Sequence, residues 1–124
     1  MTRSRKSAKD AGTRFASHVS AWLAGRLGDG GIERRATTGA LDRGDITGLV
    51  TSDGRRVIAE CKDYGGRYLV GEWLKEAQTE ARNDKAAVGV VIAKRRGTTD
   101  PGDQVVFTTV RDLAVLLGAD RDAE

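Results

Sequence analysis

The sequence has few of the residues that form covalent cross-links or bind soft metals. Its 124 residues include one cysteine, one histidine and one proline. A single cysteine excludes an intrachain disulfide, and Cys61 and His18 alone cannot form a Cys/His metal cluster. Cys61 follows an apolar run and is interpreted as a buried core residue.

Long apolar runs and aromatic clusters are missing as well. No stretch approaches the roughly 20 apolar residues that span a bilayer, and the basic N-terminus leads into no apolar signal segment. We therefore expect a soluble, intracellular protein of the cytoplasm. Two residues each of Trp, Tyr and Phe are too few for an aromatic array that binds single strands by stacking.

Positive charge is only in small excess, with 21 Lys and Arg against 18 Asp and Glu. This balance alone does not indicate a nucleic-acid partner, and the distribution of the basic residues is more informative. Two clusters have the character of phosphate contacts, so we assign them to DNA binding: Arg3, Arg5, Lys6, Lys94, Arg95 and Arg96. The alternative is a solubilising tail and a charged surface loop.

The most informative segment is a β-hairpin pattern in residues 44–62. Two apolar, β-prone stretches flank Asp53-Gly54, a dipeptide typical of two-residue hairpin turns. The resulting register has two polar cross-strand pairs: Asp45 with Lys62, and Thr47 with Glu60.

Side chains alternate along a strand, so this register divides the hairpin into a polar and an apolar face. The polar face would carry Asp45, Thr47, Leu49, Ile58, Glu60 and Lys62. The apolar face, expected to cover a core, would carry Ile46, Val50, Val57, Ala59 and Cys61.

The polar face predicts a metal-dependent phosphodiester site. Asp45 and Glu60 would lie on a diagonal of about 7–8 Å, so their carboxylates can converge on one cation. We assign Mg²⁺ to Asp45, Glu60 and Cys61, because two carboxylates, a backbone carbonyl and waters form the oxygen cage that this ion prefers. Lys62 would orient or deprotonate the attacking water, or neutralise charge on the phosphate. The alternative is a plain ion pair between Glu60 and Lys62 on a solvated strand.

The order of these residues resembles that of the PD-(D/E)xK nuclease superfamily, with Asp45 on one strand and Glu60-Cys61-Lys62 closing the next. Within it, the chain is most similar to archaeal-type and phage Holliday junction resolvases. Residues 35–39 resemble their basic strand and Ser/Thr-Gly loop, and Gly44-Asp45-Ile46 resembles their acidic strand. The resemblance extends from about residue 9 to about residue 110.

This resemblance implies an α/β fold with a restriction-endonuclease-like core, in which helices flank a mixed sheet with an antiparallel hairpin and a parallel crossover strand. It implies a homodimeric endonuclease that uses Mg²⁺, or Mn²⁺ in its place, to cut branched DNA. The catalytic residues would be Asp45, Glu60, Lys62 and Gln78. Further DNA contacts would come from Arg35, Thr38, Gly39 and Arg43.

Three points remain open in this interpretation. Gln78 is equally consistent with a boundary residue at the edge of a helix stripe. The protein is alternatively a catalytically weak or inactive DNA-binding protein on the same fold, or a nicking or restriction-type nuclease. The dimer interface is expected around Val105–Val110 and Leu113–Leu117, which would otherwise only complete the monomer core.

One departure from the family concerns the first helix. The resembled proteins carry a glutamate after a Gly-x-x-Phe pattern, whereas this chain has Ala16 after Phe15. His18 or Glu33 would then replace the missing acid, or fewer protein groups hold the metal, or activity is weak. A lone His18 is more simply a packed or solvent-facing residue.

Periodicity and turn residues predict the remaining elements. Helices are expected at 8–27, 68–84 and 111–117, and strands at 32–36, 86–93 and 104–110, with a loop at 37–44. The apolar run at 86–93 is typical of a strand buried on both faces, which implies a parallel crossover. We expect a basic flexible arm at 1–8, one nuclease-like domain at 9–118 and a frayed acidic tail at 119–124.

Overall fold

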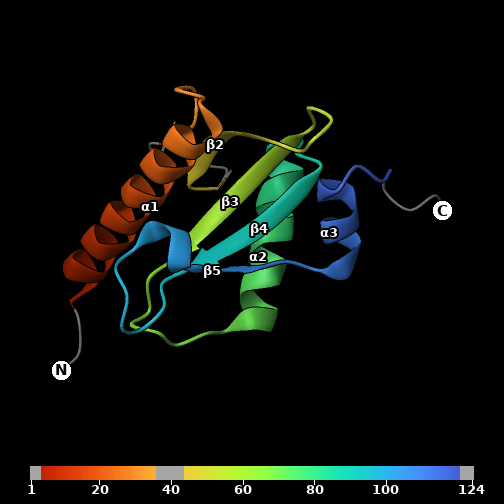
Figure 1. The fold of residues 1–124 in the computed structure, drawn as a ribbon. Helices are drawn as coiled ribbons and strands as arrows, with labels where there is room; N and C mark the ends of the chain where they lie inside the picture. Colours follow the sequence, from red (N-terminus) through yellow and green to blue (C-terminus); the bar gives the residue numbers. More distant parts are fainter. Residues whose placement is uncertain (1–3, 36–43, 121–124) are drawn as a thin grey trace.

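The computed structural model describes residues 4–35 and 44–120. They form an α/β structure whose five-stranded sheet has the order β1-β2-β3-β4-β5 (Figure 1). The strands are β1 (Glu33–Arg34), β2 (Ile46–Val50), β3 (Arg56–Lys62), β4 (Val88–Ala93) and β5 (Val105–Phe107). The helices are α1 (Arg5–Leu27), α2 (Val70–Asn83) and α3 (Val110–Leu116), with a 3-10 turn, η1 (Pro101–Asp103), before β5.

The sheet is mixed, as predicted. Among the described strands only β3 and β4 run parallel, and α2 forms the crossover between them. α1 and α3 pack on one face of the sheet and α2 on the other, where Figure 1 shows it behind the central strands. No helix within the described residues combines the length and the apolar character that crossing a bilayer requires.

The two helical layers explain the apolar run of β4. All its residues are buried, which confirms the prediction of a strand covered on both faces. Phe15 and Val19 of α1 belong to the core on one side, and Trp73 and Ala77 of α2 contact Val91 in the core on the other. α2 also lies close to its predicted position.

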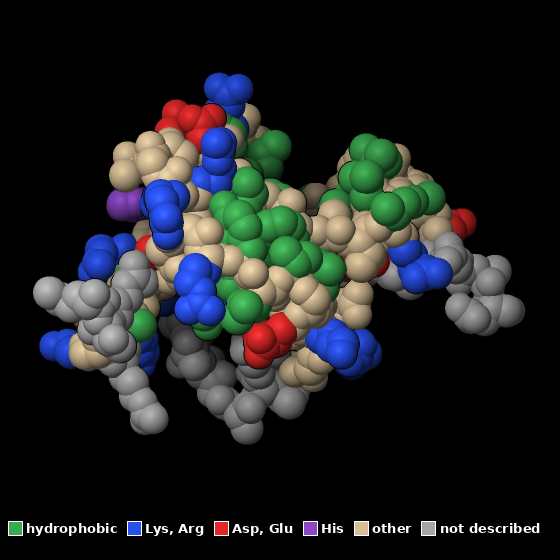
Figure 2. Space-filling view, turned by 90° about the horizontal axis from the view of Figure 1, so that it is seen from below, with side chains coloured by type: hydrophobic (Ala, Val, Ile, Leu, Met, Phe, Trp, Pro, Cys, Tyr) green, Lys and Arg blue, Asp and Glu red, His purple; other side chains and the backbone are tan. Residues whose placement is uncertain are grey.

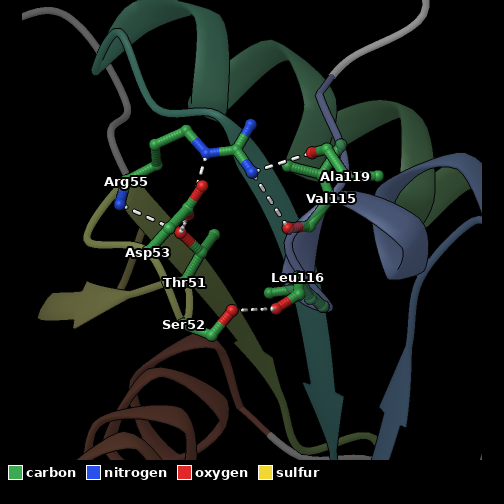
Figure 3. A network of polar contacts seen from close by, with 7 residues as sticks. All are labelled: Thr51, Ser52, Asp53, Arg55, Val115, Leu116 and Ala119. Carbon is green, nitrogen blue, oxygen red and sulfur yellow. Dashed lines mark hydrogen bonds and ion pairs between the residues drawn. The ribbon is translucent and has the colours of Figure 1, made fainter.

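The β2–β3 hairpin forms, but its connection is longer than the predicted two-residue turn. Residues 51–55 join the two strands, and Figure 3 shows α3 holding this turn. Arg55 Nη2 donates to the carbonyl oxygens of Val115 at 3.3 Å and Ala119 at 2.8 Å. These bonds link the turn to the last turn of α3 and to the residues that follow it.

A β-bulge shifts the register of the hairpin a second time. Gly48 lies inside the bulge with a φ of 90°, a left-handed conformation that glycine adopts readily. Because Ile46 pairs with Ala59, Thr47 does not face Glu60 as predicted. On the other edge of β2, Thr47 pairs with Glu33 of β1.

The N-terminal helix begins earlier than expected, at Arg5 instead of residue 8. The hydroxyl oxygen of Ser4 accepts a hydrogen bond from the backbone N–H of Ser7 at 3.1 Å, a contact typical of helix N-caps. The part of the predicted flexible arm from Arg5 onward is thus helical. The strand expected at 32–36 is limited to the two residues of β1.

The C-terminal elements also differ in length from the prediction. β5 has three residues, because α3 begins at Val110, inside the strand expected at 104–110. Thr109 Oγ1 accepts from the backbone N–H of Asp112 at 3.1 Å and caps the helix. The loop predicted at 37–44 lies almost wholly outside the described residues.

Candidate active site

Asp45 and Glu60 are direct neighbours at the ends of β2 and β3 that lie away from the turn. Asp45 N donates to Ala59 O at 2.8 Å, and Asp45 Oδ2 accepts from Cys61 N at 2.7 Å. Asp45 therefore lies beside the Ala59–Cys61 segment that carries Glu60, and because Ile46 pairs with Ala59, its predicted pairing with Lys62 is wrong. Both carboxylates line the same cavity and both act on Cys61, which places them close enough to be considered together as ligands of one cation.

The ammonium group of Lys62 lies between two carboxylates. Its Nζ is 2.6 Å from Glu76 Oε2 on α2 and 3.5 Å from Glu60 Oε1. It also lies over the rings of Tyr64, at 5.9 Å, and Trp73, at 6.0 Å. Because aromatic faces attract cations, this arrangement stabilises a charged lysine.

The surroundings of Lys62 have opposing effects on its pKa. Burial lowers the pKa of Lys62, but the hydrogen bond to Glu76 and the charges of Glu60 and Glu76 outweigh burial and raise it above the ordinary value of 10.5. Lys62 is therefore protonated at neutral pH. In this state it donates hydrogen bonds and supplies positive charge.

These residues line a cavity of about 750 Å³ between α1, the ends of β2 and β3, and the loop after β3. Asp45, Glu60 and Lys62, the three residues predicted to act together, share this cavity. Four further cations line it: Lys9, Arg34, Arg35 and Arg67. The cavity thus combines a small acidic centre with basic walls, a charge pattern suited to a phosphate backbone with a bound dication.

The donor set fits a hard metal ion held by few protein groups. Within residues 4–35 and 44–120, no group of three or more His, Cys, Asp or Glu side chains could hold a metal. Two carboxylates nevertheless match Mg²⁺, which keeps several waters and commonly binds through one or two carboxylates and substrate phosphates. The thiol of Cys61 does not fit, because burial, and then the charges of Asp45 and Glu60, raise its pKa well above 9.0. Cys61 offers only its carbonyl oxygen.

Gln78 does not reach this cavity. It lines a separate cavity between α2 and α3, together with Arg82 and Thr109. The residue of α2 that contacts Lys62 is Glu76, which the sequence analysis missed. Its position relative to Trp73 could have indicated it. Glu76 is three residues after this core residue and so lies on the same side of α2, whereas Gln78 is five residues after it and does not.

Arg35 lines the cavity, but its guanidinium is held by the protein. Nη1 and Nη2 each donate to the carboxylate of Asp84 at 3.1 Å, and Nη2 also donates to Thr47 Oγ1 at 3.1 Å. Arg56 Nη1 donates to the carbonyl of Asp84 at 2.8 Å. These hydrogen bonds therefore link the segment after β1 to the end of α2. The predicted contact of Arg35 with DNA would be an additional role.

We expect Asp84→Asn to lower the free energy of unfolding by about 1–3 kcal/mol, since the charge partner of a bidentate arginine is lost. Asp84 has a side chain that is only 6% exposed, so solvent does little to screen the pair. Urea unfolding would measure the loss. Asp53→Asn is the control, because the Asp53–Arg55 pair is much more exposed and should contribute less. Equal losses in both variants would contradict the assignment.

The predicted loop cations contact neighbouring backbone. Lys94 Nζ donates to the carbonyl oxygens of Arg95 and Thr98, and Arg95 Nη1 donates to Asp103 O at 3.1 Å. Arg96 Nη2 donates to Gly65 O at 3.2 Å, so it links this loop to the rim of the cavity. Lys6 is exposed on α1. The other predicted contacts, Arg3, Thr38, Gly39, Arg43 and the side chain of Arg5, lie outside the described residues.

Neither proposed substitute for the missing helix acid lines the cavity. His18 is exposed and borders a small hollow beside Lys94, and Glu33 is exposed on β1. Ala16, which stands at the position of the family glutamate, does line the cavity and is 2% exposed. The alanine side chain supplies no metal ligand to the cavity.

No protein-family model matches the chain, and comparisons with curated proteins and with solved structures found no significant match. The cavity itself therefore carries the functional inference.

Proposed function

We propose that the protein is a Mg²⁺-dependent endodeoxyribonuclease with a restriction-endonuclease-like core. The observation that carries this proposal is the direct juxtaposition of Asp45 and Glu60 beside a charged Lys62 in a cavity with basic walls. Phosphodiester hydrolysis needs a dication site, a way to stabilise negative charge on phosphate, and cations that hold the backbone. Each of these has a residue in the cavity.

The residues would divide the work as follows. Asp45, Glu60 and the carbonyl of Cys61 would hold the metal, which supplies an acidified water and polarises the scissile phosphate. Lys62, protonated between its two carboxylates, would donate to a phosphate oxygen as negative charge develops. Arg34 and Arg67 would bind the backbone on either side.

Branched DNA is the substrate class that we propose, as for the resembled Holliday junction resolvases. The cations lining the cavity are Lys9, Lys62, Arg34, Arg35 and Arg67, and such groups contact phosphates and carry little sequence information. Recognition would then depend on the shape of the DNA. Phosphate contacts also predict that DNA binding weakens steeply with salt. We propose that the enzyme acts in the cytoplasm.

A second candidate function is DNA binding without efficient cleavage. The observation that favours it is Ala16, which lines the cavity without supplying a third acid. In that case the metal would be bound weakly, whereas the basic walls would bind DNA unchanged.

Cleavage assays with metals separate the two candidates. We expect labelled four-way junction DNA to be cut in Mg²⁺ or Mn²⁺ and left intact in excess chelator, because oxygen ligands select hard cations. Duplex and single strand are the substrate controls. Binding to the junction without cleavage in either metal would favour the second candidate, and cleavage in chelator would refute the metal site.

We further propose that the working protein is a homodimer. Resolving a junction requires cuts in two strands related by near two-fold symmetry, which a symmetric dimer provides from one chain. An exposed apolar stripe on α3 is the expected interface: Val110, Leu113 and Leu117. Figure 2 shows hydrophobic side chains gathered at this end of the molecule and in a central area. Val106 of the edge strand β5 is also exposed.

Light scattering tests the dimer. We expect a mass of twice 13.3 kDa for the wild type and a shift toward the monomer for Val110→Glu, because Val110 is 83% exposed and its change cannot disturb the core. Leu27→Glu is the control, since Leu27 is 63% exposed at the end of α1, away from α3. A wild-type mass near 13.3 kDa, unchanged by junction DNA, would exclude the dimer.

A further inference from the structure

The contact between Glu76 and Lys62 is unusual because the fold has little need of it. α2 is already anchored by Trp73 and Ala77, which are 1% and 0% exposed. The side chain of Glu76 is 40% exposed and that of Lys62 is 12% exposed, so the pair contributes to stability less than a fully buried one would. The contact is nevertheless the shorter of the two that Lys62 makes with carboxylates, at 2.6 Å against 3.5 Å.

Glu60 and Glu76 also compete for the ammonium group of Lys62. An ammonium group has three N–H donors, and the rings of Tyr64 and Trp73 lie near two of its sides. If Glu76 did not accept from Lys62, Glu60 would be the remaining carboxylate partner among the ion pairs of Lys62. A closer pair between Lys62 and Glu60 would neutralise the carboxylate that the metal needs.

We propose that Glu76 is a positioning residue that draws Lys62 away from Glu60, which keeps the Glu60 carboxylate available to a divalent cation and leaves one Lys62 donor for substrate phosphate. This inference rests on the proposed metal-dependent nuclease function. It adds a role for α2 that the residues of the hairpin alone do not supply.

The proposal predicts a separation between stability and metal binding. Glu76→Ala should weaken Mn²⁺ binding, followed by calorimetry or electron paramagnetic resonance, and should slow junction cleavage by about 10–100-fold. Its thermal midpoint should fall only slightly, because Glu60 still pairs with Lys62. Glu76→Gln retains a hydrogen-bond acceptor and should recover part of the loss, which a purely structural role would not require.

Glu72→Ala is the matched control. Glu72 is an exposed glutamate of α2, one helical turn before Glu76, and lines the same surface hollow. It should therefore leave cleavage and Mn²⁺ binding unchanged. In a Lys62→Met background, Glu76→Ala should add no further loss, because the group that it positions is already gone.

Nuclear magnetic resonance can observe the Lys62 ammonium directly, without an activity assay. The ¹⁵N signal of the Lys62 ammonium should report an ordered group in the wild type and in Glu72→Ala, and a shifted or more mobile group in Glu76→Ala. An unchanged signal, or unchanged Mn²⁺ affinity in Glu76→Ala, would overturn the proposal. If the wild type neither binds Mn²⁺ nor cuts DNA, the nuclease function fails, and the ammonium signal still shows whether Glu76 positions Lys62.

Discussion

Replacement of Glu60 by glutamine should abolish metal-dependent cleavage of junction DNA and leave DNA binding intact or stronger. The amide has nearly the same shape as the carboxylate but cannot supply the charge that holds a dication. Glu60 is buried and lines the cavity with Asp45, so its charge is one of the two that the proposed metal site depends on. Removal of one negative charge facing the DNA backbone also favours the bound complex.

Single-turnover cleavage and a gel-shift titration, both at fixed salt, would measure the two effects separately. Asp45→Asn should behave in the same way, because its amide oxygen can still accept from the backbone N–H of Cys61. Lys62→Ala should be slower by about 10²-fold or more, because a donor that stabilises charge on phosphate is lost. Glu33→Gln is the matched control, since Glu33 is exposed on β1. Cleavage at the wild-type rate by Glu60→Gln would refute the assignment.

The sequence was most informative where the signal is local and repeated. β4 could be predicted from its unbroken apolar run, because a strand between two helical layers has no solvent face. α2 could be predicted from its helical periodicity, and the crossover between β3 and β4 from the order of elements. These features depend on neighbours within a few residues, which is the range that a sequence pattern reports.

The register of the hairpin could not be predicted, because its causes are distant in the sequence. Arg55 is held by carbonyls at the end of α3, and no local pattern contains those partners. The longer turn shifts the pairing by one residue, and the bulge at Gly48 shifts it by one more. A shift of one residue would have turned the acids to the opposite face.

Two successive shifts explain why Asp45, Glu60 and Lys62 still share one cavity. Side chains alternate with a period of two, so the combined shift returns Asp45 to the face that carries Glu60. The sequence thus predicted which residues meet and was wrong about which pairs lie opposite. Gly48 was the available signal for the bulge, since an isolated glycine inside a strand often marks one.

The choice of Gln78 shows a different limit. A sequence pattern indicates the extent of a helix and its apolar stripe, but the angle at which α2 crosses the sheet decides which polar neighbour of that stripe reaches Lys62. That angle depends on the packing of Trp73 and Ala77 against Val91. Glu76 is consequently a finding of the structure.

The bulge yields the second large prediction: Gly48→Ala should lower the free energy of unfolding by about 2–5 kcal/mol. Two costs add. The φ of 90° is unfavourable for any residue with a Cβ. A Cβ at this position would also lie 2.4 Å from the carbonyl oxygen of Gly31 and 3.0 Å from Ile32 Cα, and neither is a side chain that can move aside. Urea unfolding followed by tryptophan fluorescence would measure the loss.

Gly54→Ala separates the two costs. Gly54 belongs to the same hairpin and has nearly the same φ, 88°, but a Cβ added there would meet no atom within 4 Å. Its alanine variant should lose only about 1–2 kcal/mol. The excess loss at Gly48 would then measure how closely the segment before β1 packs on the bulge. Because that contact holds the strand leading to Asp45, Gly48→Ala should also reduce cleavage, whereas Gly54→Ala should not. Equal stability losses in the two variants would show that the close approach to Gly31 does not constrain the fold.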